Sequence, residues 1–279
     1  MATAHNGEVE LYFETFGDRT DPTLLLVNGL GSQCINYDAR WCEMFAASGF
    51  HVIRFDNRDT GLSSQLDGIT YTLRDLADDA AAVLDAANVA LAHVMGVSMG
   101  GMIAQRLAID HADRVWSLTS VMSSTGESEY GRSSPEALAV LMAESAGTRD
   151  EYVDLQIAAK RVYGSKPEWI DEEYLRARAE QAYDRNYSPA GIGRQMRAIK
   201  HDGDRTDALR ALDVPTLVMH GDRDTLIDPS GGRRTAELIP GARYVEFEGL
   251  GHDYPEAVWE RWVETWADFV RTVGPRAGP

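Results

Sequence analysis

The sequence predicts an α/β protein with a mostly parallel sheet, flanked by helices and interrupted by an all-helical insertion. Short apolar runs alternate with segments of helical spacing up to residue 122 and again from residue 212. Such alternation implies crossover connections between parallel strands. Residues 123–211 show helical spacing and no strand signal. We therefore expect a core made of residues 1–122 and 212–279, with residues 123–211 as a helical block on top of the sheet.

The elements of the first half follow from hydrophobic periodicity. Residues 9–14 alternate polar and apolar side chains, which is typical of an antiparallel edge strand with one exposed face. Continuous apolar runs predict buried strands, whereas apolar residues spaced three and four apart predict helices. These rules give strands at residues 23–27, 51–55, 93–97 and 115–122, and helices at residues 34–48, 72–87 and directly after residue 98.

The second half begins with charged helices and then returns to strands. Helical spacing covers residues 135–146, 151–163, 168–185 and 189–201. Strands resume at residues 215–220 and 242–247, and residues 255–273 form a last helix.

The composition limits the partners and the compartment. The chain of 279 residues has 27 basic and 44 acidic side chains, and the net charge of −17 opposes binding to nucleic acids and to anionic membranes. Its start lacks a signal segment, and no apolar stretch has the length of a membrane span. Cys34 and Cys42 lie eight residues apart in one predicted helix, too far for a disulfide. We expect a cytoplasmic protein with reduced cysteines.

Residues 96–100 carry the strongest functional signal. Gly96 and Gly100 flank Ser98 in a G-x-S-x-G pattern between a predicted strand and a predicted helix. A serine at such a turn takes a strained backbone conformation, and side chains two residues to either side would collide. Its hydroxyl is exposed at the positive end of the helix, where developing negative charge is favoured. Ser98 is therefore the predicted nucleophile.

A nucleophilic serine needs a base, and the base needs an acid that orients it. His252 is the predicted base, because it ends a glycine-containing loop directly after a strand, and the other histidines are interpreted as structural. Asp224, in the loop after another strand, is the predicted orienting acid. Asp222 is interpreted as a capping or ion-pairing residue and Asp228 as a helix N-cap. The chain order Ser98, Asp224, His252 is the order that one particular fold requires.

Stabilising an oxyanion requires two backbone N–H groups. Met99, next to the nucleophile, is one predicted donor, and Leu30, between two glycines after the strand of residues 23–27, is the other. Leu30, Met99 and Tyr254 are the candidate substrate contacts. The glycines around Leu30 lack the third glycine of a dinucleotide-binding fingerprint. No H-E-x-x-H motif or Cys/His cluster occurs. We therefore expect neither a cofactor nor a metal.

These motifs together resemble the α/β-hydrolase superfamily over nearly the whole chain. The segment at residues 56–63 is similar to the family's D-x-R-G-x-G-x-S, with Asp59 where glycine is usual. A segment with aspartate at this position is similar to that of the aclacinomycin methylesterase group of bacterial esterases. Asn28 stands where the family often has histidine. The other matching segments are the elbow at residues 96–100, the G-x-x-D loop at 221–224 and the G-x-G-H loop at 249–252.

The resemblance implies that Ser98, Asp224 and His252 are nucleophile, acid and base, and that residues 123–211 form a cap that shapes the substrate pocket. The hypothesis is a serine carboxylesterase that hydrolyses a small to medium apolar ester through an acyl-enzyme. Its expected partners are a small-molecule ester or lactone and water.

Other activities on the same fold stay open. An enol-lactone or other lactone hydrolase, a cofactor-free perhydrolase or haloperoxidase, and a C–C bond hydrolase would use the same triad. A ligand-binding protein with slow or no turnover is the alternative from another class. Ser98 argues against epoxide hydrolases and dehalogenases, because these need a carboxylate at the nucleophile position.

Overall fold

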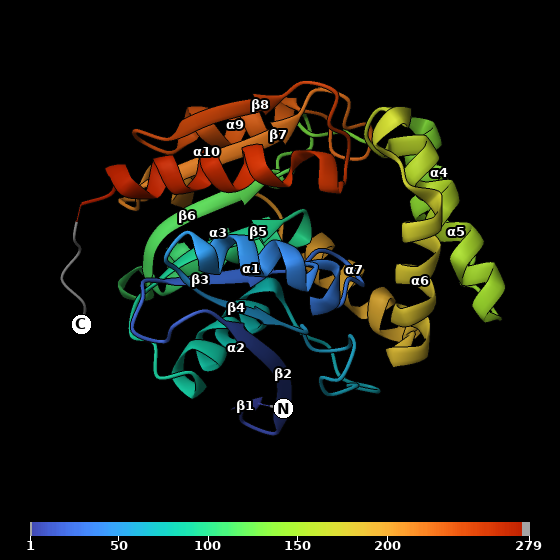
Figure 1. The fold of residues 1–279 in the computed structure, drawn as a ribbon, viewed down its shortest axis with the longest axis horizontal. Helices are drawn as coiled ribbons and strands as arrows, with labels where there is room; N and C mark the ends of the chain where they lie inside the picture. The colour runs from blue at the N-terminus through green and yellow to red at the C-terminus, as the bar shows by residue number, and fades with distance from the viewer. Residues whose placement is uncertain (1, 275–279) are drawn as a thin grey trace.

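One mixed sheet of eight strands organises residues 2–274, the part of the chain that the computed structural model describes (Figure 1). Neighbouring strands pair antiparallel at the β1–β2 and β2–β4 positions and parallel everywhere else. The prediction of an α/β fold with a mostly parallel sheet is confirmed. In spatial order the strands are β1 (Ala2–Asn6), β2 (Val9–Phe16), β4 (His51–Phe55), β3 (Thr23–Val27), β5 (Ala92–Val97), β6 (Val115–Val121), β7 (Thr216–Gly221) and β8 (Arg243–Phe247).

The central strands are apolar along their whole length because both faces of the sheet are covered. Every residue of β3, β4, β5 and β7 is buried. The spatial order reverses beside β3, since β4 lies on one side of it and β5 on the other. In parallel sheets, loops at the carboxyl ends of strands around such a reversal form the ligand-binding crevice. The loops after β3, β5, β7 and β8 therefore converge at one edge.

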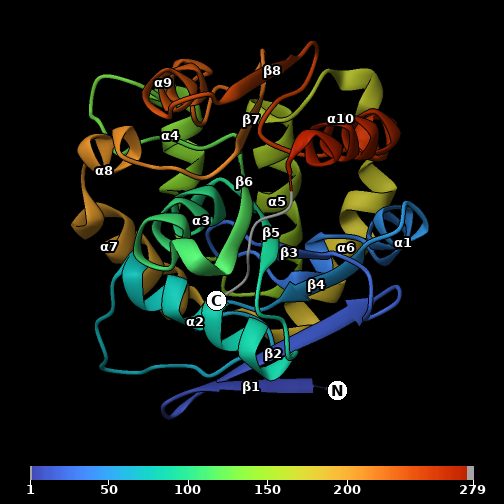
Figure 2. The ribbon, with the colours of Figure 1, turned by 90° about the vertical axis from the view of Figure 1, so that its left-hand side faces the viewer.

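Helices cover the two faces of the sheet, as Figure 2 shows. On one face α2 (Leu73–Ala86) and α3 (Met99–Asp110) pack with the short α8 (Thr206–Arg210) and α9 (Ser230–Leu238). On the other face lie α1 (Ala39–Ala47) and α10 (Trp259–Thr272). Trp41 of α1 meets Trp262 of α10 edge to face, with ring centroids 5.4 Å apart, and both side chains are fully buried. Each face thus has its own apolar core.

The segment between β6 and β7 contains five α-helices, the short α8 and four longer helices that form the insertion block. In Figure 1, α4, α5 and α6 stand side by side beyond one end of the sheet. Hydrogen bonds tie the block to loops at the carboxyl ends of the strands, for example from Lys166 N–H to Gly249 O (2.9 Å). The helices are α4 (Pro135–Leu141), α5 (Arg149–Tyr163), α6 (Glu172–Asn186) and α7 (Pro189–Asp202), and a 3₁₀ turn (Pro167–Trp169) precedes α6.

Several local predictions differ from the structure; for example, the helix predicted at residues 135–146 ends at Leu141. The helix predicted at residues 34–48 is wrong, because a 3₁₀ turn (Cys34–Asn36) precedes α1 and Asp38 caps α1 by accepting the N–H of Arg40. Cys34 and Cys42 therefore lie on different elements, and both are free and buried. The helix predicted at residues 168–185 begins only after Asp171, whose side chain caps α6.

Strand β1 and helix α8 were not predicted, because β1 is short and largely polar and α8 spans a single turn. Residue 1 and residues 275–279 of the predicted core lie outside the described residues. Within residues 2–274, no helix combines the length and the apolarity that crossing a membrane requires.

Candidate active site

Ser98 lies at the sharp turn between β5 and α3, with φ 58° and ψ −122°. This is a strained conformation for a residue with a side chain. The two flanking glycines permit it, because a Cβ at Gly96 would lie well within 3.0 Å of Gly100 O. A Cβ at Gly100 would lie equally close to Val27 O on the neighbouring strand. The glycines of the G-x-S-x-G pattern are therefore required by backbone packing.

Hydrogen bonds hold the Ser98 backbone on both sides. Its N–H donates to Val121 O (2.9 Å), the last residue of β6. Its carbonyl oxygen accepts from Gly101 N–H (2.9 Å) and from the hydroxyl of Ser123 (2.8 Å). Gly29 lies directly beside it, since a Cβ there would be 3.8 Å from Ser98 Oγ. The strain is thus maintained by the surrounding structure, and the loop after β3 contacts the serine.

Asp224 lies in the loop after β7 and is 2% exposed. Its Oδ1 accepts the N–H groups of Leu226 and Ile227, both at 2.9 Å. Its Oδ2 lies 2.7 Å from His252 Nδ1 and 3.2 Å from His220 Nε2. Burial tends to raise the pKa of this carboxyl, but the charge of His252 and the hydrogen bonds from both histidines outweigh it and lower the pKa to about 2. Asp224 is therefore ionised at neutral pH.

His252 lies in the loop after β8 and is 9% exposed. Because the ionised Asp224 only accepts hydrogen bonds, His252 Nδ1 carries the proton between them. The other ring nitrogen, Nε2, is then the one that can accept a proton. The ring of Tyr163 meets the imidazole edge to face, with centroids 6.1 Å apart. The structure thus brings Asp224 and His252 together in an arrangement suited to general-base chemistry.

One predicted oxyanion donor directly follows the serine in the chain, and the other lies in the loop that contacts it. Met99 is the first residue of α3, so its N–H has no acceptor within the helix. Leu30 follows Gly29, which contacts Ser98. The N–H of the next residue, Gly31, donates to Oε1 of Gln195 (2.8 Å) on α7. The insertion block therefore holds one side of this loop.

Asn28 stands where the family that the sequence resembles often has histidine, and it stabilises the loop after β3. Its side-chain amide donates to Phe55 O (3.3 Å), and its main-chain carbonyl oxygen accepts from the side-chain amide of Asn57 (3.1 Å). The Asn28 side chain is buried. Asn28 therefore joins the loop after β3 to the end of β4.

Asp59 also has a structural explanation. It has φ 69°, a conformation that favours glycine. Its carboxylate accepts both Nε and Nη2 of Arg194 at 2.7 Å and the hydroxyl of Tyr71 at 2.7 Å. The aspartate thus fastens α7 of the insertion block to the loop after β4.

Among the other residues considered from the sequence, Tyr254 packs away from the polar groups of the site. Its ring stacks on Tyr37 and Trp41, with centroids 5.7 and 5.2 Å apart, beneath α10. Asp222 accepts the N–H of Gly249 (2.7 Å), and Asp228 accepts that of Ser230 at the start of α9 (2.9 Å). Sequence reasoning missed Gln195, Arg194 and the contact of His220 with Asp224.

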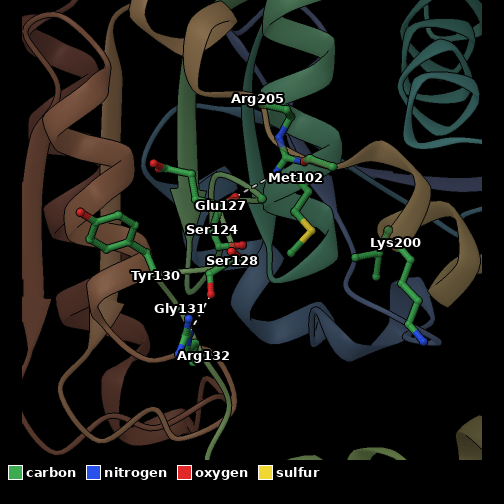
Figure 3. A pocket seen from close by; sticks show the side chains of 12 residues that line it. Met102, Ser124, Glu127, Ser128, Tyr130, Gly131, Arg132, Lys200 and Arg205 are labelled. Carbon is green, nitrogen blue, oxygen red and sulfur yellow. Dashed lines mark hydrogen bonds between the residues drawn. The ribbon is translucent and has the colours of Figure 1, made fainter.

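A cavity of about 320 Å³ opens beside α3 (Figure 3). Its lining includes Met102, one turn after the serine, whose N–H donates to Ser98 O (3.3 Å). Figure 3 shows Met102 across from Tyr130, with Lys200 at one side. Buried Arg205 contributes to the wall and donates to Ser124 O (2.7 Å). The cavity lies between the loop after β6 and the end of α7.

Comparisons with known proteins identify the family of this chain. The sequence profile described as the α/β hydrolase fold matches residues 22–255. Rhodomycin D methylesterase DauP of Streptomyces sp. (strain C5) is 33% identical, over 91% of this chain and 92% of its own length. Rhodomycin D methylesterase DnrP of Streptomyces peucetius is 31% identical, over 91% and 93%.

A solved structure shows the same fold. The enol-lactonase from Burkholderia xenovorans LB400 superposes with a TM-score of 0.78 at 24% identity, covering 96% of this chain and 99% of the enol-lactonase. At that identity the likeness concerns the fold. With a profile match over most of its length and relatives above 30% identity, this chain belongs to the α/β-hydrolase fold family and is similar to its aclacinomycin methylesterase-like members.

Proposed function

We propose that this protein is a serine carboxylesterase in which Ser98 is the nucleophile, His252 the general base and Asp224 the orienting acid. The observation that carries the proposal is the buried pair of Asp224 and His252, 2.7 Å apart, at the same sheet edge as the strained serine turn. The methylesterase relatives support an ester as substrate. A methyl ester on an apolar acid is therefore the first substrate to test.

The reaction follows from the roles of these groups. His252 Nε2 takes the hydroxyl proton as Ser98 Oγ attacks the ester carbonyl, and Leu30 and Met99 N–H groups bind the oxyanion. The C–O bond to the leaving alkoxide then breaks, and His252 returns its proton to that alkoxide. A water, deprotonated by His252, attacks the acyl-enzyme and releases the carboxylic acid and free Ser98. Asp224 stays ionised throughout and stabilises the protonated imidazole.

We also propose that residues 123–211 act as a cap over this site. This block contacts the loop of Leu30 through Gln195 at Gly31 and the loop of His252 through Lys166 at Gly249. It also contacts the loop of Asp224, where the Thr225 hydroxyl donates to Val162 O (3.3 Å). Of the residues that line the cavity beside α3, all but Met102 belong to this block. We infer that its shape selects the acyl part of the substrate.

Labelling and hydrolysis together test the proposal. We expect a fluorophosphonate to modify Ser98 and the wild-type protein to hydrolyse an activated aryl ester and a methyl ester. Ser98→Ala should abolish the labelling and the hydrolysis of both esters. Leu30→Ala should retain most activity, because the oxyanion donor is a backbone group. Full activity in Ser98→Ala would overturn the nucleophile assignment. An unlabelled Ser98 in a folded protein would instead indicate a ligand-binding protein.

A further inference from the structure

The histidine loop, residues 249–253, is bound along its length by residues 160–166, which comprise the end of α5 and the connection that follows. This contact joins the insertion block to the loop that carries the proposed base. It involves main-chain groups of both segments. The main-chain hydrogen bonds run from Lys166 N–H to Gly249 O (2.9 Å) and from His252 N–H to Tyr163 O (2.6 Å).

Ser165 makes the side-chain contacts of this interface and is 4% exposed. Its hydroxyl donates to Oδ1 of Asp253, and the same hydroxyl oxygen accepts the N–H of Gly251 (3.0 Å). Its own N–H donates to both carboxylate oxygens of Asp253, at 3.2 and 3.3 Å. The residues immediately before and after His252 are therefore both bound to Ser165.

The packing leaves no space for this loop to slide. A Cβ at Gly251 would lie well within 3.0 Å of Gly164 O, and one at Gly164 would lie 2.8 Å from Asp253 Oδ2. The two backbones thus touch where Ser165 binds. A displacement of the α5 end must displace His252 as well.

We propose that Ser165 is a positioning residue for His252, so that the insertion block sets the place of the base. The inference rests on the proposed function, since it requires His252 to act as base. Asp224 fixes the orientation of the imidazole, whereas Ser165 fixes the backbone from which the imidazole extends. Without the hydroxyl, Gly251 N–H loses its acceptor and Asp253 loses a hydroxyl donor, both in a buried place. A misplacement of about 1 Å lowers turnover about 100-fold.

Two substitutions and a matched control test the positioning role in the whole enzyme. Ser165→Ala should lower kcat on an activated aryl ester by about 10- to 100-fold with KM unchanged. Ser165→Thr keeps the hydroxyl and should recover most of kcat. Thr148→Ala removes a hydroxyl at the other end of α5, where Oγ1 accepts the N–H of Glu151 (3.3 Å), and should keep the wild-type kcat. Urea unfolding gives the folded fraction of each variant.

A spectroscopic measurement separates this inference from the proposed function. The proton between His252 Nδ1 and Asp224 should give a downfield proton resonance, which Ser165→Ala shifts or broadens and Thr148→Ala leaves in place. An unchanged resonance in Ser165→Ala, or a kcat per folded molecule equal to that of wild type, overturns the positioning role. If fluorophosphonate leaves wild-type Ser98 unlabelled, the proposed function fails, and the resonance alone decides whether Ser165 positions His252.

Discussion

Nε2 of His220 lies 3.2 Å from Oδ2 of Asp224, the carboxylate oxygen that also contacts His252. His220 is fully buried near the end of β7. Its Nε2 lies 2.8 Å from Ile227 O, an acceptor, so this nitrogen carries the proton. The proposed acid therefore receives a second imidazole donor from the strand that precedes its loop.

Removing this donor should change the acid stability of the protein. Because the pKa of Asp224 is lowered to about 2 in the fold, its ionised form stabilises the fold above the ordinary carboxyl pKa, and this stabilisation is lost as the pH falls toward 2. His220→Leu should raise the pKa of Asp224, so the stabilisation at neutral pH is smaller and its loss is complete at a higher pH. His220→Gln retains an N–H donor and should behave like wild type. Urea unfolding between pH 2 and 6 measures the difference, and equal profiles for the two variants would contradict it.

The glycines of the elbow should tolerate no side chain. We expect Gly100→Ala to destabilise the protein severely and to abolish activity, because its Cβ would collide with Val27 O. Gly193→Ala, inside α7, is the matched control, since its Cβ meets nothing nearer than the side chain of Arg197 at 3.7 Å. The control should gain about 0.5–1 kcal/mol in unfolding free energy. Thermal unfolding of both variants measures the contrast, and a stable, active Gly100→Ala would refute the steric argument.

Gln195 should influence acylation without touching the serine. It is fully buried, accepts from Gly31 N–H (2.8 Å) and donates to Arg58 O (2.9 Å). Gln195→Leu leaves Gly31 N–H, next to Leu30 in the chain, and Arg58 O without these partners, so we expect the rate of Ser98 acylation to fall about tenfold. The rate of fluorophosphonate labelling measures it. Labelling at the wild-type rate in a folded Gln195→Leu would show that the loop keeps its geometry unaided.

Removing one partner of the ion pair between Asp59 and Arg194 should lower the free energy of unfolding strongly. Arg194→Met leaves a buried carboxylate without its cation and should lower the unfolding free energy by about 3–5 kcal/mol. The double variant Asp59→Gly with Arg194→Met removes both charges and should recover much of this loss. Arg149→Met, which removes a half-exposed partner of Asp184, should cost less than about 1 kcal/mol. Urea unfolding measures these variants together with the single Asp59→Gly, and additive effects of the two single substitutions in the double variant would exclude the coupling.

The elements that could be predicted from the sequence are those determined by patterns within a few consecutive residues. Hydrophobic periodicity and apolar runs predicted the strands from β2 to β8. Each strand is one continuous segment whose own residues carry the pattern that predicts it. The turn at Ser98 was predictable for the same reason, since its constraints lie within a few residues. Strand β1 and the break before α1 lacked such a local signal.

The contacts between distant segments were not predictable from the sequence. Gln195 and Gly31 are far apart in the chain, and no pattern in either segment indicates their hydrogen bond. Ser165 likewise resembles an ordinary loop serine until the fold places it against Asp253. Tyr254 shows the converse, since its nearness to His252 in the chain suggested a place in the site, whereas its ring lies among Tyr37 and Trp41.

The insertion block also divides the chain between the proposed catalytic groups. Ser98 precedes the block, whereas Asp224 and His252 follow it. A cut in the connection between α4 and α5 would give an N-terminal fragment that carries the nucleophile and a C-terminal fragment that carries the acid and the base. The pairing of β6 with β7, from Leu118–Thr216 onward, holds the two fragments in one sheet. This protein is therefore suited to fragment complementation, in which restored hydrolysis reports that the two fragments have associated.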